Sequence, residues 1–159
     1  MCQRGFSLVE LIIIIAITGI LMAIATLNWN AMQTKSAVES QIKTIHADLM
    51  QVRLQALTSK TPRSVVINGQ LYKAYASTDI TVTPLETKQL RFPVTWSGGT
   101  LTFDAQGLTN NQGSLCVLPT NSLAVINSAA IDSLVVSQAR INIGKRTGTE
   151  CNSDNIEQK

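Results

Sequence analysis

The chain begins MCQRGFSLVELIIIIAITGILMAIATLNW, residues 1–29, and this apolar stretch sets its organisation. Between Leu8 and Leu27 it is long enough to cross about 30 Å of hydrocarbon as a helix. Glu10 is the only charged residue in this run. Because a charged side chain at the centre of a bilayer costs roughly 2.5–3.5 kcal/mol, an acidic residue here is expected to have a partner. The sequence therefore predicts a membrane-spanning helix whose one carboxylate needs a cation.

The residues that flank the apolar run predict its orientation. Trp29 follows the run directly, where an amphipathic ring would lie at the membrane interface, and Arg4 precedes it. Since basic residues favour the cytoplasmic side, we expect the short amino-terminal end in the cytoplasm and the bulk of the chain outside.

Three simpler explanations account for less of the run. An ordinary secretory signal would be cleaved at the small residues 23–25, but its apolar core would then begin with a carboxylate. A lipoprotein signal has its cysteine after the apolar run, whereas Cys2 precedes it. A plain membrane anchor explains the length of the run and leaves Glu10 unexplained.

The residues RGFSLVE, at positions 4–10, resemble the class III signal of type IV pilins and of the pseudopilins of type II secretion. In that signal a short basic leader ends in glycine, a hydrophobic residue follows, and glutamate is fifth in the mature chain. The resemblance implies cleavage between Gly5 and Phe6 by a prepilin peptidase and methylation of the new amine of Phe6. It also implies that Glu10 pairs with the terminal amine of a neighbouring subunit, which neutralises the buried charge during filament assembly.

The chain becomes polar after Trp29 but keeps a helical pattern. Apolar residues recur at alternating spacings of four and three, which indicates one face of an amphipathic helix: Val38, Ile42, Ile45, Leu49, Val52 and Ala56. The helix is expected to stop before Pro62. His46, the only histidine, lies beside this face and is interpreted as a solvated or boundary residue.

Short β-prone runs separated by turn residues follow Pro62. The pair Asn68-Gly69 between two such runs predicts a two-residue hairpin within residues 64–75. Further strands are expected at residues 80–83, 89–94, 100–103, 114–118, 122–126, 133–136 and 140–143.

These elements predict an α+β chain in which a long amino-terminal helix packs on a mainly antiparallel β domain, and the family resemblance implies the pilin fold. The expected parts are a leader (1–5), a transmembrane and assembly helix (6–29), an amphipathic continuation (30–61) and a periplasmic β-rich domain (62–159). The resemblance also implies a single-pass protein of the bacterial inner membrane that enters a filament on assembly.

Two stretches of the β domain resemble the minor pilins and the H-type pseudopilins. The stretch LTFDAQGLTNNQGSLCVL, residues 101–118, is similar to the strand, glycine turn and strand of that group. The stretch SLVVSQARINIGKRTG, residues 133–148, is similar to its closing hairpin. The resemblance implies a minor pilin or pseudopilin, with other subunits and inner-membrane lipid as its partners. A major pilin subunit stays open as an alternative.

The cysteines number three: Cys2, Cys116 and Cys151. Removal of a leader would take Cys2 away and leave an even count. A bridge between Cys116 and Cys151 would close a loop of roughly 35 residues, which stabilises the fold by about 3–4 kcal/mol in the chain-entropy account. Such a bridge needs an oxidising compartment such as a bacterial periplasm. The alternative is two unrelated small apolar residues.

The residue sets of common enzymes are missing from the sequence. It contains no serine, histidine and aspartate set, no second histidine for zinc, no phosphate-binding glycine loop and no C-x-x-C motif. Asp104 and Asp132 are single carboxylates near turns, where capping is the common role. We therefore expect no enzymatic activity, no metal site and no cofactor.

DNA binding is the alternative function. Some minor pilins of this group bind DNA through arginines of the closing hairpin, and here GKRTG, residues 144–148, supplies Lys145 and Arg146, with Arg140 upstream. Carboxylates at positions 150, 154 and 157 follow closely, and no aromatic residue accompanies the cations as a stacking platform. The formal net charge of +3 is also too small to indicate a nucleic-acid partner.

Overall fold

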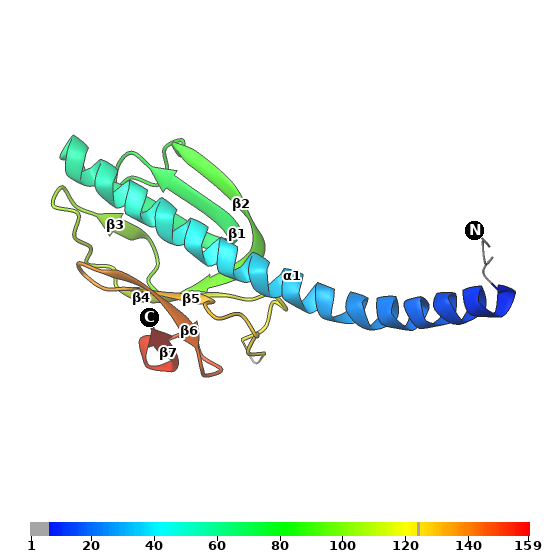
Figure 1. Ribbon diagram of the computed structural model, residues 1–159. Helices are drawn as coiled ribbons and strands as arrows, with labels where there is room; N and C mark the ends of the chain where they lie inside the picture. The colour runs from blue at the N-terminus through cyan, green and yellow to red at the C-terminus, as the bar shows by residue number, and fades with distance from the viewer. Residues whose placement is uncertain (1–6, 124) are drawn as a thin grey trace. The chain divides into compact units, whose positions relative to one another are not determined.

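The computed structural model describes residues 7–123 and 125–159, and the chain divides into two compact units, Met1–Thr34 and Lys35–Lys159 (Figure 1). One helix, α1 (Leu8–Ser59), contributes its first part to the first unit and its second part to the other. The boundary at residue 34 lies close to the expected change from the transmembrane segment to the amphipathic continuation.

The described part of the first unit is helical, and its large apolar side chains are exposed. An 18-residue window of α1 has a mean hydropathy of 2.8, and none of it is buried. By length and composition this helix could cross a membrane, a test that a signal sequence near an amino terminus also passes. The expected apolar helix is therefore present.

The second unit begins with the amphipathic half of α1. All six residues of the predicted apolar face are buried: Val38, Ile42, Ile45, Leu49, Val52 and Ala56. The helix ends at Ser59, and Lys60 takes a left-handed conformation with φ of 54° just after it. Because the residue before a proline disfavours helical geometry, Pro62 fixes this boundary.

A single seven-stranded antiparallel sheet forms the rest of the second unit. Its spatial order is β3-β1-β2-β4-β5-β6-β7. The strands are β1 (Arg63–Tyr75), β2 (Glu86–Trp96), β3 (Leu101–Phe103), β4 (Gly113–Val117), β5 (Ser133–Val136), β6 (Ile141–Arg146) and β7 (Ile156–Gln158). A short 3-10 helix, Ser153–Asn155, precedes β7.

The amphipathic half of α1 packs across one face of this sheet (Figure 1). The buried face of the helix joins apolar residues of the sheet in one core, among them Tyr72, Phe103, Leu115 and Leu134. Burial of these side chains supplies the main favourable term for the second unit. The expected long helix on an antiparallel β domain is therefore confirmed.

The predicted hairpin at Asn68-Gly69 is wrong. Strand β1 continues through both residues, and the connection to β2 comes only after Tyr75. Gly69 does take a positive φ, 58°, but the pairing register with β2 shifts between Gly69 and Leu71. An Asn-Gly pair supplies the left-handed residue of a β-bulge as well as that of a tight turn, and here it forms the bulge.

Two other strand predictions are also wrong. Residues 80–83, all of them described, lie in the irregular β1–β2 connection. Residues 122–126 lie in the β4–β5 connection and form no strand over the described positions, which exclude Ala124. The last strand, β7, has no counterpart among the predictions.

Candidate assembly helix and closing hairpin

Glu10 lies in the first turn of α1 and is exposed. Its neighbours Leu8, Val9 and Leu11 are also exposed, by 54–74%. No cation within ion-pair distance of the Glu10 carboxylate is found among residues 7–123 and 125–159. An apolar surface of this extent on a helix must be covered by lipid or by other protein. Any partner for the charge must then come from the same covering environment or from beyond the described residues.

The polar group in the middle of the apolar run is satisfied within the helix. Thr18 donates its hydroxyl to the carbonyl oxygens of Ile14 and Ile15, at 2.9 and 3.0 Å. This back-bonding removes the cost of a hydroxyl in an apolar environment. Glu10 has no such local solution, because a carboxylate cannot donate to a carbonyl.

The predicted processing residues Gly5 and Phe6 lie outside the described residues, as do Cys2 and Arg4. Cleavage after Gly5 and the pairing of Glu10 with the Phe6 amine therefore stay predictions.

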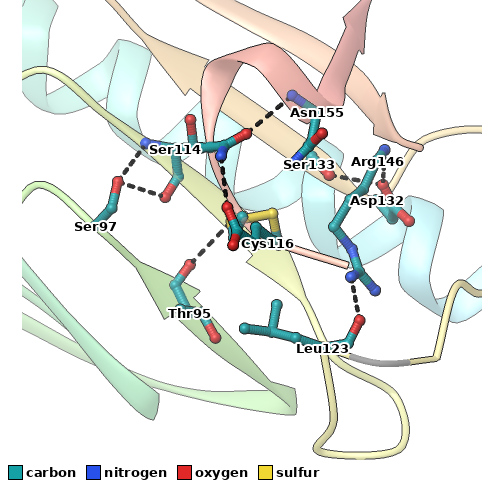
Figure 2. Close-up of a disulfide and its surroundings, with 12 residues drawn as sticks. Thr95, Ser97, Ser114, Cys116, Leu123, Asp132, Ser133, Arg146 and Asn155 are labelled. Carbon is teal, nitrogen blue, oxygen red and sulfur yellow. Dashed lines mark hydrogen bonds between the residues drawn. A yellow bond between two sulfur atoms is a disulfide. The ribbon is translucent and has the colours of Figure 1, made fainter. Parts of the chain in front are cut away.

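The two remaining cysteines form the disulfide that was expected as one of two alternatives. Cys116 on β4 is bonded to Cys151, with 5.9 Å between their Cα atoms (Figure 2). Together with Val135 and Ile156 they make a small apolar cluster separate from the main core. The bridge therefore ties the carboxy-terminal segment to an inner strand of the sheet.

Arg146, a candidate DNA-binding residue, is fully buried. Its guanidinium Nη1 donates to the carbonyl oxygen of Leu123 (Figure 2) and to that of Gly148. Its Nη2 donates to the carbonyl oxygen of Val125 at 2.7 Å. Leu123 and Val125 belong to the β4–β5 connection, residues 118–132. The side chain thus holds this connection against β6 and offers no charge to a phosphate backbone.

Lys145 is also held inside the fold. Its Nζ lies 2.9 Å from Oδ2 of Asp132 and 2.6 Å from the carbonyl oxygen of Asn127. The Asp132 side chain is fully buried, and its Oδ1 accepts from the backbone N–H of Arg146 and from the hydroxyl of Ser133, both at 2.7 Å. The prediction that Asp132 caps a turn is therefore wrong, since this carboxylate is the anchor of a buried polar cluster.

Arg140 differs from the two cations that follow it. It is exposed and lies in the turn between β5 and β6, where its carbonyl oxygen accepts from the backbone N–H of Ser137 at 2.8 Å. The three cations thus do not gather on one surface. Side chains alternate between the two faces of a strand, so the adjacent positions of Lys145 and Arg146 on β6 place them on different sides of the sheet. This alternation could have been recognised in the sequence.

Polar side chains also join α1 to the sheet. Lys88 lies 2.7 Å from Oδ1 of Asp48 and 3.1 Å from Glu86. The hydrogen bond that Lys88 donates to the Asp48 carboxylate holds the pKa of Lys88 above its ordinary value, and burial raises the pKa of the Tyr72 phenol. His46 lies with its Nε2 3.1 Å from the carbonyl oxygen of Ile141, a structural contact between α1 and β6.

No group of three or more metal-ligating side chains occurs in the part of the chain that the structure describes. Asp104 accepts from the backbone N–H groups of Gln106 and Leu108, the turn role expected for it. The two hydrogen bonds to Asp104 stabilise this turn.

Residues 1–26 match the family described as "Prokaryotic N-terminal methylation motif". This motif stands at the start of a chain whose helix packs on an antiparallel sheet. The likeness to this family thus covers the amino-terminal 26 residues of the chain.

Two crystal structures of the type IV minor pilin FimU of Pseudomonas aeruginosa strain PAO1 share the fold of this chain. The first has a TM-score of 0.52 at 18% identity and covers 77% of this chain and 94% of the FimU chain. The second has a TM-score of 0.50 at 16% identity and covers 76% and 98%. At such identities the likeness concerns the fold. No curated protein sequence matches the chain.

Proposed function

We propose that this pilin-like protein is a minor subunit of a type IV pilus or of a type II secretion pseudopilus. One observation carries the proposal: an apolar helix whose described large side chains are exposed contains a single carboxylate, Glu10, with no cation near it among the described residues. The amino-terminal motif and a β domain with the fold of a minor pilin support the same function.

In this function the helix has two successive environments. Before assembly it lies in the inner membrane as a single span, with the second unit in the periplasm. Cleavage after Gly5 by the prepilin peptidase creates a terminal amine on Phe6, which is then methylated. In the filament, apolar faces of neighbouring helices replace lipid, and Glu10 pairs with the Phe6 amine of an adjacent subunit. The pair fixes the axial register, because one residue of slip would leave two charges unpaired in an apolar bundle.

Substitution of Glu10 tests the assembly role. The variant Glu10→Ala should insert into the membrane and be processed as the native chain is, because it loses a charge and no apolar surface. It should be absent from sheared filaments, which immunoblotting of the filament and membrane fractions measures. Glu10→Asp, which keeps the charge, should retain partial incorporation. The matched control is Glu157→Ala, an exposed carboxylate of β7, which should be incorporated normally. Normal incorporation of Glu10→Ala would contradict the proposal.

The quantity of this subunit in filaments tests the minor role separately. Quantitative mass spectrometry of sheared filaments should find it at a small fraction of the main component. If it is itself the main component, the major-subunit alternative is correct while the role of Glu10 stands.

A further inference from the structure

A polar cluster beside the hairpin of β5 and β6 brings together a lysine ammonium, an asparagine carboxamide and an aspartate carboxylate. Lys145 lies on β6, Asn127 in the β4–β5 connection and Asp132 just before β5. Nζ of Lys145 and Nδ2 of Asn127 both donate to the same oxygen, Oδ2 of Asp132, at 2.9 and 2.8 Å. Nζ also lies 3.4 Å from Oδ1 of Asn127, the oxygen bonded to the carbon of the carboxamide.

The orientation of the Asn127 carboxamide follows from its partners. Its Nδ2 faces an acceptor, the Asp132 carboxylate, and its Oδ1 accepts from the backbone N–H of Ala129 at 3.0 Å. A flipped amide would place an NH2 group against an N–H and an oxygen against a carboxylate. The carbonyl oxygen is thus held by a donor, and the amide nitrogen by an acid.

We propose that Lys145 and Asn127 form an intramolecular isopeptide bond with Asp132 as the proton-transferring group. The Lys145 ammonium gives one proton to Asp132, and its free amine attacks the Asn127 carboxamide carbon. The Ala129 N–H stabilises the charge that develops on Oδ1. Asp132 delivers the protons that Nζ loses to Nδ2, the carbon–Nδ2 bond breaks, and ammonium leaves. Two protons pass from Nζ to Nδ2, the Asp132 carboxylate is regenerated, and no oxidant, reductant or cofactor is needed.

The cluster favours this reaction because its members are fixed before the reaction begins. Asp132 is fully buried, and its second oxygen is held by the Ser133 hydroxyl and the Arg146 N–H. Nζ is positioned by the Asn127 carbonyl oxygen as well as by Asp132. Holding a nucleophile against its target in this way replaces a bimolecular encounter by a local step.

Charged side chains near the cluster bind backbone groups and leave the contacts among Lys145, Asn127 and Asp132 intact. Glu39 of α1 directs its Oε1 to the backbone N–H of Ala130, and Lys159 directs its Nζ to the carbonyl oxygen of the same residue. Arg146 directs its guanidinium to backbone carbonyl oxygens, away from the carboxylate. Among the described residues, Lys145 is thus the amine that reaches both Asp132 and Asn127.

Peptide mass spectrometry of the full chain, extracted from membranes and reduced, tests the bond. Trypsin should not cleave after a linked Lys145, so residues 141–146 should be found joined to residues 92–140 with the loss of one ammonia. Fragment spectra should place the link at Asn127. Lys88 provides an internal control, because its polar partners among the described residues are the carboxylates of Asp48 and Glu86 and include no carboxamide, so it should stay unlinked.

Two variants separate the reaction from the packing of the cluster. Lys145→Arg keeps the positive charge without a reactive amine, and Asp132→Asn keeps the shape without the proton acceptor. Both should abolish the joined peptide. A native chain that yields the free peptide 141–145 and an unlinked peptide 92–140 overturns the proposal, whatever the variants do. This outcome leaves the assembly function unaffected, because the bond is measured by peptide mass spectrometry and the role of Glu10 is measured separately by incorporation into filaments.

Discussion

Charged groups behave in opposite ways in the two units. In the first unit a single carboxylate, Glu10, lies on an exposed apolar helix with no cation near it among the described residues. In the second unit Lys145, Arg146 and Asp132 are all held by hydrogen bonds within the fold. A charge left without an internal partner indicates a partner from outside, whereas a charge fully satisfied within the fold indicates a structural role. The comparison therefore favours the helix over the hairpin as the site of function.

Of the changes that test this comparison, loss of the Cys116–Cys151 bridge should have the largest effect on the stability of the second unit. Replacing both cysteines by alanine should lower the free energy of unfolding of the second unit by about 3–4 kcal/mol, because the bridge restricts the unfolded chain. The helical signal of the first unit should not change. Thermal unfolding of the detergent-solubilised chain, followed by near-UV circular dichroism, measures this effect.

Cys2→Ala is the matched control for the double variant, since Cys2 lies in the predicted leader. It should unfold as the native chain does. Equal stability of the bridged and unbridged chains would show that the β6–β7 pairing and the buried Arg146 hold the carboxy-terminal segment without the covalent link.

Replacement of Arg146 by alanine should have the next largest effect. It leaves carbonyl oxygens of the β4–β5 connection without their donor and opens a cavity beside β6, so we expect a loss of about 2–3 kcal/mol. Arg140→Ala, an exposed residue of the same hairpin, should change stability by less than about 0.5 kcal/mol. Chemical denaturation of both variants measures the difference. A DNA-binding hairpin would give the reverse pattern, with normal stability and weaker salt-sensitive DNA retention for both.

Much of the fold could be predicted from the sequence because its signals are long or local. The apolar run is long enough to be recognised as a possible membrane span. The apolar face from Val38 to Ala56 repeats over several helical turns, so its helical period is unambiguous. The bridge between Cys116 and Cys151 was one of few pairings open to the chain. Strands β5 and β6 were predicted because both are short β-prone runs bounded by turn residues, and the family resemblance implied that they form a hairpin.

The failures of prediction came from residues whose role depends on distant contacts. Asn68-Gly69 has the same local preference in a turn and in a bulge, and only the pairing of β1 with β2 decides between them. Asp132 and Arg146 are charged residues that sequence reasoning places at the surface. Their burial depends on the β4–β5 connection, which has no regular pattern and folds back over β6.

The smallest predicted effect concerns alkaline pH and the contacts between α1 and the sheet. The pKa of Lys88 is raised by its hydrogen bond to Asp48, and the pKa of Tyr72 is raised by burial. A group whose pKa is higher in the folded state than in the unfolded state stabilises the fold below its unfolded pKa, and this contribution is lost as the pH rises. Stability should therefore be flat near neutral pH and fall above about pH 10.

Tyr72→Phe and Lys88→Arg separate the two contributions. The Tyr72 hydroxyl is buried with no hydrogen-bond partner among the described residues, so its removal should leave stability unchanged or higher at pH 7 and weaken the alkaline loss. Lys88→Arg keeps a cation beside Asp48 at all accessible pH values and should remove the other part. Equilibrium unfolding between pH 7 and 11.5 measures both. An alkaline loss of equal size in the native chain and in the double variant would mean that other groups carry it, and that the polar contacts between α1 and the sheet are as replaceable as exposed ion pairs.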